Sequence, residues 1–305
     1  MKNKKILLIG GTRYFGKILA EKLLASGNDL TILSRGSLPE SLKTAKHCRG
    51  SRADSRLLEN LFSDNKFDVV YDQVCMNAQH AQLVAKNLVR TSTNYFMTST
   101  VSVYDVGADI SESHFDTAKY SYTTAVDEVT NYKEAKRQAE YEILKSGFKN
   151  FSLIRIPIVL GLNDYTLRLH KHIEHGLNST PLYFPNLKAR MSYVESHHIA
   201  DVLYRLGEKG ISAGALNVAS PDPISMQDLL DLSQKETGNA FKLIQGAEFE
   251  ALNEQLKSKF QSPFGVSEDW FISTEKLRSL GIQLPALGDW LPKLVHDLTV
   301  KLKAV

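Results

Sequence analysis

Residues 6–16 read Ile6-Leu-Leu-Ile-Gly-Gly-Thr-Arg-Tyr-Phe-Gly16, and this stretch decides the fold. A short apolar run, typical of a buried parallel strand, leads through glycines into a segment with helical spacing. Glycines let the backbone approach a pyrophosphate closely, and the start of a helix offers unpaired N–H groups to an anion. The sequence therefore predicts a dinucleotide-binding turn after the first strand, formed by the residues Gly10, Gly11, Thr12, Arg13, Tyr14, Phe15 and Gly16.

Strand and helix patterns alternate after this turn. Short β-rich apolar runs predict strands at Ile6–Ile9, Leu30–Leu33, Phe67–Tyr71, Tyr95–Met97 and Phe151–Ile156. Amphipathic segments between them predict helices at Gly16–Ser26, Ser55–Phe62, Ala78–Leu88 and Tyr132–Lys145. Repeated β-α-β units with short turns imply right-handed crossovers, so we expect an α/β fold with a Rossmann-type doubly wound parallel sheet.

The alternation of predicted strands and helices ends after Ile156, where several prolines interrupt an irregular stretch. We expect a helix at His198–Gly207, a late strand at Ala215–Val218 and a helix capped by Ser225. The sequence thus predicts a dinucleotide-binding domain made of residues 1–160 plus 190–220. A smaller, interleaved C-terminal substrate-binding domain would comprise residues 161–189 plus 221–305.

The composition of the 305 residues excludes several classes of protein. A formal net charge of +3 creates no nucleic-acid-binding field by itself, so we expect a small-molecule substrate rather than a nucleic-acid partner. Two cysteines, Cys48 and Cys75, cannot form a disulfide framework and suit a reducing compartment. No signal peptide and no run of roughly 18 apolar residues is evident, which favours a cytoplasmic protein without membrane contact. We expect the protein to be a monomer or a homodimer.

The end of the second predicted strand bears on the choice of cofactor. An acidic residue at this place would accept a hydrogen bond from the adenosine ribose 2′-hydroxyl and select NAD, but the sequence has Ser34. Arg35 and Arg13 offer guanidinium groups to a 2′-phosphate instead. The alternative is that both arginines are solvated surface residues. We expect NADP, with NAD as the alternative.

Tyr132 and Lys136 are candidate catalytic residues. They stand one helical turn apart, with Asn131 and Glu134 as a predicted cap, so both side chains project from one helix face. A free tyrosine titrates near 10, and a neighbouring ammonium lowers that pKa toward the range of a proton shuttle. The same spacing also occurs on helices without catalytic function.

Several motifs resemble those of the extended short-chain dehydrogenase/reductases, the NAD-dependent epimerase/dehydratase family, and in particular its divergent GGTRxxG-type members. The resemblance covers almost the whole chain. The stretches of this sequence that resemble family motifs are 10–16 for TGxxGxxG, Gly50–Asp54 for GDxxD, Thr98–Tyr104 for SSxxVYG, Tyr132–Lys136 for YxxxK, Arg155–Gly161 for RxxNVYG and Met191–Ala200 for RDFIHVDDVA. The sequence departs from the family pattern at Arg13, Ser51 and 72–75, where Asp-Gln-Val-Cys replaces HxAA.

The resemblance implies roles for individual residues. Thr100 would hydrogen-bond the reacting oxygen, Tyr132 would shuttle its proton, and Lys136 would hold the ribose and tune Tyr132. Cofactor contacts would also come from Ser51, Arg52 and Pro157. The resemblance implies an NADP(H)-linked oxidoreductase or epimerase acting on a carbonyl or sugar-nucleotide-like substrate.

Two further observations narrow the function. Dehydratases of this family carry Asp-Glu after the catalytic threonine, and Val101-Ser102 stand here, which disfavours a 4,6-dehydratase. His170, His172 and His175 do not share one helix face, so we expect no metal site. The altered segment at 72–75 leaves open a non-catalytic NAD(P)-binding regulatory or RNA-binding protein on the same fold.

Overall fold

The computed structural model of the protein describes residues 1–89 and 91–304. Its centre is a seven-stranded sheet in which every pair of neighbouring strands is parallel. This sheet confirms the predicted Rossmann-type fold. Its strands, in spatial order, are β11 (Gly214–Asn217), β7 (Phe151–Ile156), β5 (Asn94–Thr100), β4 (Val69–Asp72), β1 (Lys5–Ile9), β2 (Asp29–Ser34) and β3 (Lys46–Arg49).

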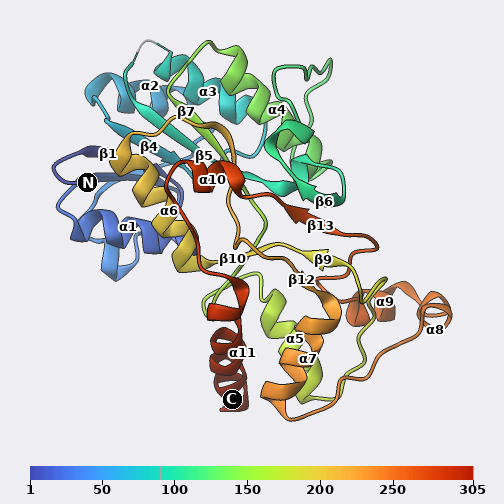
Figure 1. Cartoon of the computed structure of the whole chain (residues 1–305). Helices are drawn as coiled ribbons and strands as arrows, with labels where there is room; N and C mark the ends of the chain where they lie inside the picture. Colours follow the sequence, from blue (N-terminus) through green and yellow to red (C-terminus); the bar gives the residue numbers. More distant parts are fainter. Residues whose placement is uncertain (90, 305) are drawn as a thin grey trace.

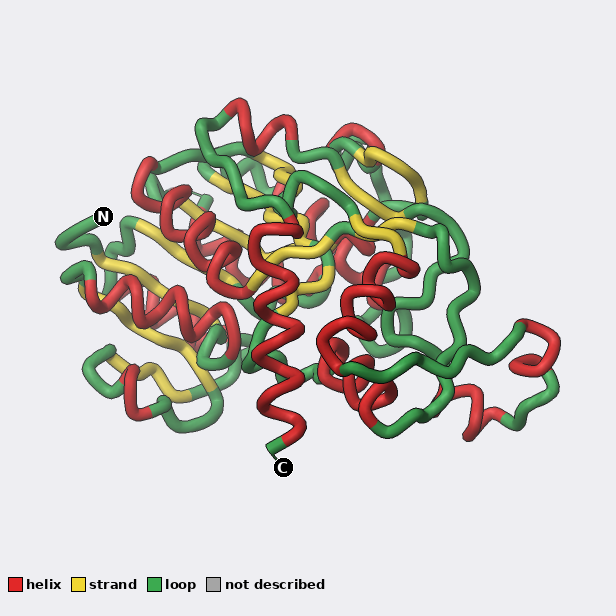
Figure 2. The backbone as a smooth tube through the Cα atoms, turned by 60° about the horizontal axis from the view of Figure 1, so that its bottom comes forward, coloured by secondary structure: helices red, strands yellow, loops and turns green. Residues whose placement is uncertain are grey.

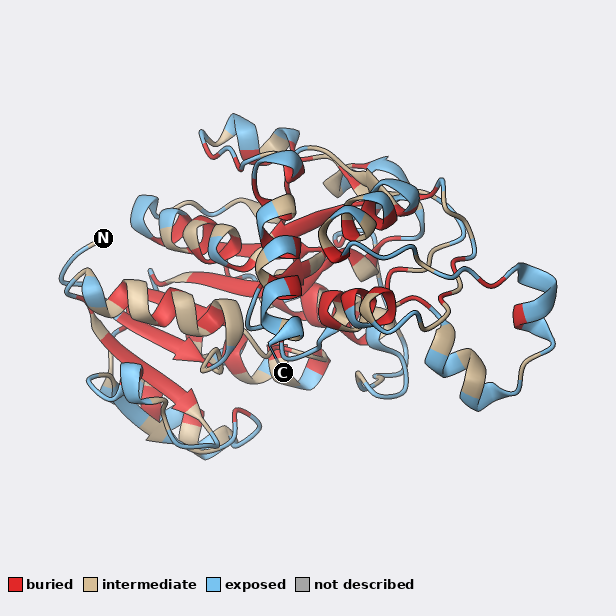
Figure 3. Ribbon diagram, turned by 90° about the horizontal axis from the view of Figure 1, so that it is seen from below, coloured by how far each residue is buried: buried red, intermediate tan, exposed pale blue. Residues whose placement is uncertain are grey.

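Helices cover both faces of this sheet (Figure 1). On one face lie α1 (Tyr14–Ala25), α6 (Ser196–Lys209) and α10 (Glu275–Ser279); on the other lie α2 (Ser55–Asp64), α3 (Ala78–Leu88) and α4 (Tyr132–Lys145). Side chains along β1 alternate between the two cores: Leu8 packs with α1, whereas Leu7 packs with the α2–α4 side. Figure 3 shows the resulting burial of the strands between the helix layers.

Side-chain caps fix where three of these helices begin. Asp54 accepts a hydrogen bond from the Leu57 amide at 3.0 Å at the start of α2. Asn77 does the same for α3, and Asn131 accepts from the Glu134 amide at 3.1 Å at the start of α4. Such caps satisfy donors that have no partner inside the helix. The predicted capping of α4 by Asn131 is therefore confirmed.

The remaining elements form a second group (Figure 2) around the helices α5 (Arg168–Leu177), α7 (Met226–Thr237) and α11 (Leu287–Lys303). These three helices contribute to one hydrophobic core. The short helices α8 (Gly246–Glu250) and α9 (Glu254–Phe260) project from this group. Two small sheets connect it to the main sheet: β10 (Tyr193–Glu195) with β8 (Ile158–Leu160), and β12 (Ile224–Ser225), β9 (Arg190–Met191), β13 (Trp270–Ile272) with β6 (Gly107–Ile110). The predicted division into two domains stays a prediction.

Some features differ from the expectations. The sequence analysis missed β3, whose residues are mostly exposed at the edge of the sheet. The strand expected at 67–71 begins at Val69, and the strand expected at 215–218 begins at Gly214. Within residues 1–89 and 91–304, no helix is both long and apolar enough to cross a membrane.

A fully buried ion pair joins β7 to α4. The side chains of Arg155 and Glu140 are both 0% exposed, and Arg155 Nη2 lies 2.6 Å from Glu140 Oε2. Ser99 and Thr117 donate to the same carboxylate at 2.5 and 3.0 Å. Arg155 Nη1 donates to the Tyr104 hydroxyl at 2.8 Å. Because each charge meets an opposite charge and further polar partners, the pair compensates for its removal from water.

Removing one partner of this pair should strongly destabilise the protein. Arg155→Met leaves the Glu140 carboxylate buried without its cation, which costs about 3–5 kcal/mol of unfolding free energy. Urea denaturation followed by circular dichroism measures the loss. Lys293→Met removes a cation from an exposed i,i+4 pair with Asp297 and should have a small effect. An Arg155→Met protein as stable as the Lys293→Met control would contradict the prediction.

Candidate functional site

The predicted phosphate turn connects β1 to α1 through glycines with positive φ angles. Gly10 has φ +76° and Gly11 φ +67°, conformations that side-chain-bearing residues rarely adopt. The Gly10 amide donates to the Leu33 carbonyl at 2.8 Å, which holds the turn against the end of β2. A Cβ atom on Gly16 would lie 2.5 Å from the Gly11 Cα atom. The first turn of α1 therefore approaches the backbone of Gly11 too closely for any residue larger than glycine at position 16.

The first turn of α1 has no side-chain cap. Arg13 occupies the N-cap position in an extended conformation, its side chain is exposed, and it makes no capping hydrogen bond. The first helical hydrogen bond runs from the Lys17 amide to the Arg13 carbonyl at 3.1 Å. The preceding amides at the start of α1, with the positive end of the helix dipole, suit an anionic group.

The aromatic residues after Arg13 face the protein interior. The Tyr14 ring packs against Gly161, where a Cβ would lie 3.2 Å from Tyr14 Cε2, and it contacts the ring of Phe15 edge-on. Burial, together with the nearby carboxylates of Asp164 and Glu195, raises the pKa of the Tyr14 phenol. The backbone of Tyr14 thus belongs to the phosphate turn, while its side chain supports the segment after β8.

The ends of β2 and β3 place the residues predicted to meet the adenosine. Ser34 Oγ donates to the Gly36 carbonyl at 3.0 Å and lies 3.0 Å from His47 Nε2. Arg35 is exposed. Ser51 is also exposed, and its hydroxyl accepts a hydrogen bond from the Ala53 amide at 3.2 Å.

Arg52 differs from these residues because its guanidinium is buried. It is 8% exposed and forms an ion pair with Asp72, which is fully buried at the end of β4. Tyr95 donates its hydroxyl to the same carboxylate at 3.0 Å, and the Val74 amide donates to it at 3.2 Å. Burial alone would lower the pKa of Arg52, but Asp72, Cys75 and Tyr95 together raise it. Arg52 Nε and Nη1 have no partner among the described residues.

The turn that Asp72 anchors forms one wall of the glycine turn. A Cβ on Gly10 would meet a Val74 methyl at 2.7 Å, and a Cβ on Gly11 would meet Gln73 Cγ at 3.0 Å. The side-chain nitrogen Nε2 of Gln73 is buried without a hydrogen-bond partner in the described residues. The sequence analysis noted 72–75 only as a departure and did not foresee this role, since the pairing with Arg52 joins distant segments.

Lys136 and Thr100 lie at the same edge of the sheet. Lys136 is 2% exposed, and its Nζ donates to the carbonyls of Cys75 and Thr98, both at 2.7 Å. Thr100 ends β5, is 8% exposed, and its Oγ1 accepts a hydrogen bond from the Ser102 amide at 3.1 Å. Thr100 pairs in register with Ile156, the last residue of β7. The buried Pro157 follows directly after Ile156.

Tyr132 is the first residue of α4 and stays accessible. Its side chain is 41% exposed, and the described residues offer its hydroxyl no hydrogen-bond partner. It stands one helical turn before Lys136, whose bonds fix the start of α4 over the carboxyl ends of β4 and β5. The structure thus brings Lys136, Thr100 and the start of α4 to one edge of the sheet, and Tyr132 stays exposed at the start of this helix.

Two of the histidines of α5, His172 and His175, make contacts within the protein. His172 is fully buried, lies 3.1 Å from Ser233 Oγ and stacks on Phe241. Burial lowers the pKa of His172 to about 3. His175 contacts the Pro181 carbonyl at 3.0 Å. Across residues 1–89 and 91–304, no three metal-binding side chains gather around one point.

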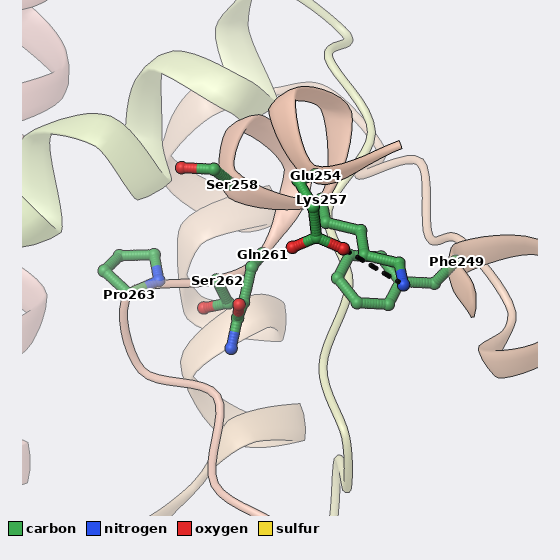
Figure 4. Close-up of a pocket in the computed structure, with 7 residues that line it drawn as sticks. All are labelled: Phe249, Glu254, Lys257, Ser258, Gln261, Ser262 and Pro263. Carbon is green, nitrogen blue, oxygen red and sulfur yellow. Dashed lines mark ion pairs between the residues drawn. The ribbon is translucent and has the colours of Figure 1, made fainter. Parts of the chain in front are cut away.

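Two cavities lie away from the glycine turn. One of about 370 Å³ opens beside α9 and is bordered by Lys257, whose ammonium lies 3.7 Å from Glu254 (Figure 4). Another of about 350 Å³ is lined by residues 183–188 and 243–246. Both belong to the segments expected to form the substrate-binding domain.

Comparison with known proteins identifies the family. Residues 6–219 match the NAD dependent epimerase/dehydratase family. The chain belongs to this family. Chloroplast stem-loop binding protein of 41 kDa b from Arabidopsis thaliana is 25% identical over 254 residues, which cover 77% of this chain. The match spans only 64% of that relative's length.

Solved structures share the fold of this chain. The UDP-glucuronic acid 4-epimerase from Bacillus cereus, in complex with NAD, is 17% identical with a TM-score of 0.70 over 99% of each chain. The Bordetella bronchiseptica enzyme WbmH, in complex with NAD+, is 16% identical with a TM-score of 0.71 over 96% of each chain. These similarities show the shared fold of this family member.

The Asp72–Arg52 pair should control the stability of the site. Asp72→Ala leaves the Arg52 cation buried and removes the anchor of the β4 turn, at a cost of about 3–5 kcal/mol in unfolding free energy. Chemical denaturation measures this loss. Asp105→Ala removes a carboxylate that is 86% exposed and paired with Lys133, and it should change stability little. Equal stabilities of the two variants would show that the buried pair contributes nothing.

Proposed function

We propose that this protein binds a nicotinamide dinucleotide at the carboxyl edge of its sheet and is an oxidoreductase or epimerase of carbonyl or sugar-nucleotide-like substrates. One observation carries the proposal: the glycine turn and the Gln73–Val74 wall face each other between β1 and β4. The strand order reverses at this point of the sheet. Open parallel sheets bind their ligands at such topological switch points.

The residues present fit the dinucleotide. The positive φ angles at 10 and 11 favour glycine, which leaves the turn without side chains there, and the uncapped start of α1 suits the pyrophosphate. The unpartnered donors of Gln73 and Arg52 are suited to ligand acceptor atoms. The two solved epimerase-fold enzymes described above contain NAD, which supports the same class of cofactor here.

We further propose NADP(H) rather than NAD(H). No carboxylate ends β2, and Ser34 is already engaged with His47 and Gly36. The exposed guanidinium groups of Arg35 and Arg13 supply charge-assisted hydrogen bonds to a 2′-phosphate. NAD lacks the 2′-phosphate and therefore offers these two cations no anion at the adenosine ribose.

The proposed chemistry divides between Tyr132, Lys136 and Thr100. A bound nicotinamide ring supplies the acceptor or donor of hydride. Lys136 uses two of its three N–H donors on the Cys75 and Thr98 carbonyls and keeps the third for the ribose. The Tyr132 hydroxyl transfers the proton of the substrate oxygen, and Thr100 hydrogen-bonds that oxygen. Val101 and Ser102, as neutral side chains, do not support an elimination step.

We assign substrate binding to residues 161–189 plus 221–305, beside a dinucleotide-binding domain of residues 1–160 plus 190–220. The cavity of about 350 Å³ supports this assignment, because it is lined by 183–188 and 243–246, which come from both parts of the proposed substrate-binding domain. Its volume is in the range of small-molecule sites.

The Arabidopsis thaliana relative favours a second function, RNA binding, because its name describes a stem-loop binding protein. Five arginines, at positions 13, 35, 49, 56 and 205, are exposed and form no ion pair within the described residues. Binding of a hairpin RNA that weakens steeply with salt, with no turnover of any carbonyl substrate, would favour this second function.

Arg35→Ala should reduce NADP+ affinity by about tenfold and leave NAD+ affinity unchanged, because a charged hydrogen bond contributes about 1.5–3 kcal/mol. Isothermal titration calorimetry with each dinucleotide measures both constants. Equal affinities of the unmodified protein for NADP+ and NAD+ would refute the proposed preference.

Tyr132→Phe should lower turnover by roughly 100-fold or more, since it removes the hydroxyl that transfers the proton. The ring and the helix start stay, so the thermal unfolding temperature should not change. A screen of carbonyl and sugar-nucleotide substrates, followed by NADPH absorbance and product analysis, provides the assay. Full activity of the phenylalanine variant would assign the proton transfer to another residue.

A further inference from the structure

We propose that Arg49, at the end of the edge strand β3, is a further specificity-determining residue that binds the 2′-phosphate of NADP(H) together with Arg35. The inference rests on the proposed function. It adds a residue from a strand that the sequence pattern did not reveal and that none of the family motifs contains.

The pairing of β2 with β3 places Arg49 beside the ribose position. Arg49 stands opposite Ser34 in the parallel register, and the Gly50 amide donates to the Ser34 carbonyl at 3.0 Å. Arg49 Nε donates to the Arg35 carbonyl at 3.4 Å. The Arg49 guanidinium is therefore held next to Arg35 at the end of β2, where this fold binds the adenosine ribose.

The charge of Arg49 is available to a ligand. Its side chain is exposed, and within the described residues neither Arg49 nor Arg35 forms an ion pair. At the opposite end of β3, Lys46 is paired with Asp29 at 2.7 Å. Charges on an edge strand often serve only to prevent pairing with another chain. That role explains Lys46, but it does not explain why the unpaired Arg49 is held by the Arg35 carbonyl at the end of β2.

His47 reinforces this arrangement. Its Nε2 lies 3.0 Å from the Ser34 hydroxyl, within hydrogen-bond distance. Ser34 is therefore engaged with β3 rather than free to bind a ribose 2′-hydroxyl. A phosphate dianion with several acceptor oxygens can bind both guanidinium groups at once. The site thus suits a 2′-phosphate better than the hydroxyl of NAD.

Calorimetry on the full chain tests the proposal with NADP+, NAD+, 2′,5′-ADP and 5′-ADP as probes. Arg49→Ala should weaken NADP+ and 2′,5′-ADP by about tenfold and leave NAD+ and 5′-ADP unchanged. Arg49→Lys, which keeps the charge but loses the planar fork, should fall between the two. Arg205→Ala removes an exposed arginine on α6 and serves as the matched control without effect.

The possible outcomes separate this inference from the proposed function. A preference for NADP+ that Arg49→Ala leaves intact overturns the inference alone and identifies Arg49 as an edge-strand charge. An equal loss of NADP+ and NAD+ binding also overturns it, since the effect is then not directed at the 2′-phosphate. If the unmodified chain binds neither dinucleotide, the proposed function fails and the inference fails with it.

Discussion

The buried Arg155–Glu140 pair determines where the candidate chemistry stands. Tyr132, Lys136 and Glu140 follow one another at four-residue intervals on α4, so the three side chains form one stripe along the helix. Glu140 binds Arg155 of β7, and Lys136 binds the carbonyls at the ends of β4 and β5. Two buried charges with fixed partners prevent the helix from rotating or sliding on the sheet. These two anchors also fix the start of α4, where Tyr132 stands one turn before Lys136.

The same pair reaches the elements that follow the main sheet. The Tyr104 hydroxyl, which accepts from Arg155, donates to Asn217 on β11 at 2.7 Å. The side-chain nitrogen Nδ2 of Asn217 donates to the carbonyls of Ile110 and Ser273, at the paired strands β6 and β13. One polar network therefore joins the core of the sheet to the small sheet that leads toward the C-terminal helices. A polar network of this kind specifies one arrangement, because every buried group needs its own partner.

Local patterns predicted the elements that bury apolar residues. The helices at 78–88 and 132–145 and the strand at 151–156 have the expected bounds, since periodicity and caps mark them in the sequence. The strand β3 escaped because its residues Lys-His-Cys-Arg lie at an edge, where only hydrogen bonds to one neighbour define a strand. Buried ion pairs escaped for another reason. Arg52 and Asp72, like Glu140 and Arg155, are charged residues whose burial depends on a partner distant in sequence, and no local pattern reveals this pairing.

The departures from the family pattern also gain a physical meaning from this pairing. The family's HxAA segment begins with a histidine, and this chain has Asp72 at that place, where a fully buried carboxylate would be costly alone. Arg52, in the turn after β3, supplies the compensating cation next to Ser51, itself a departure. The burial of Asp72 at the end of β4 therefore depends on Arg52 from the turn after β3. Because the coupled pair still holds Gln73 and Val74 against the glycines, the altered motif preserves the wall of the site with a different set of side chains.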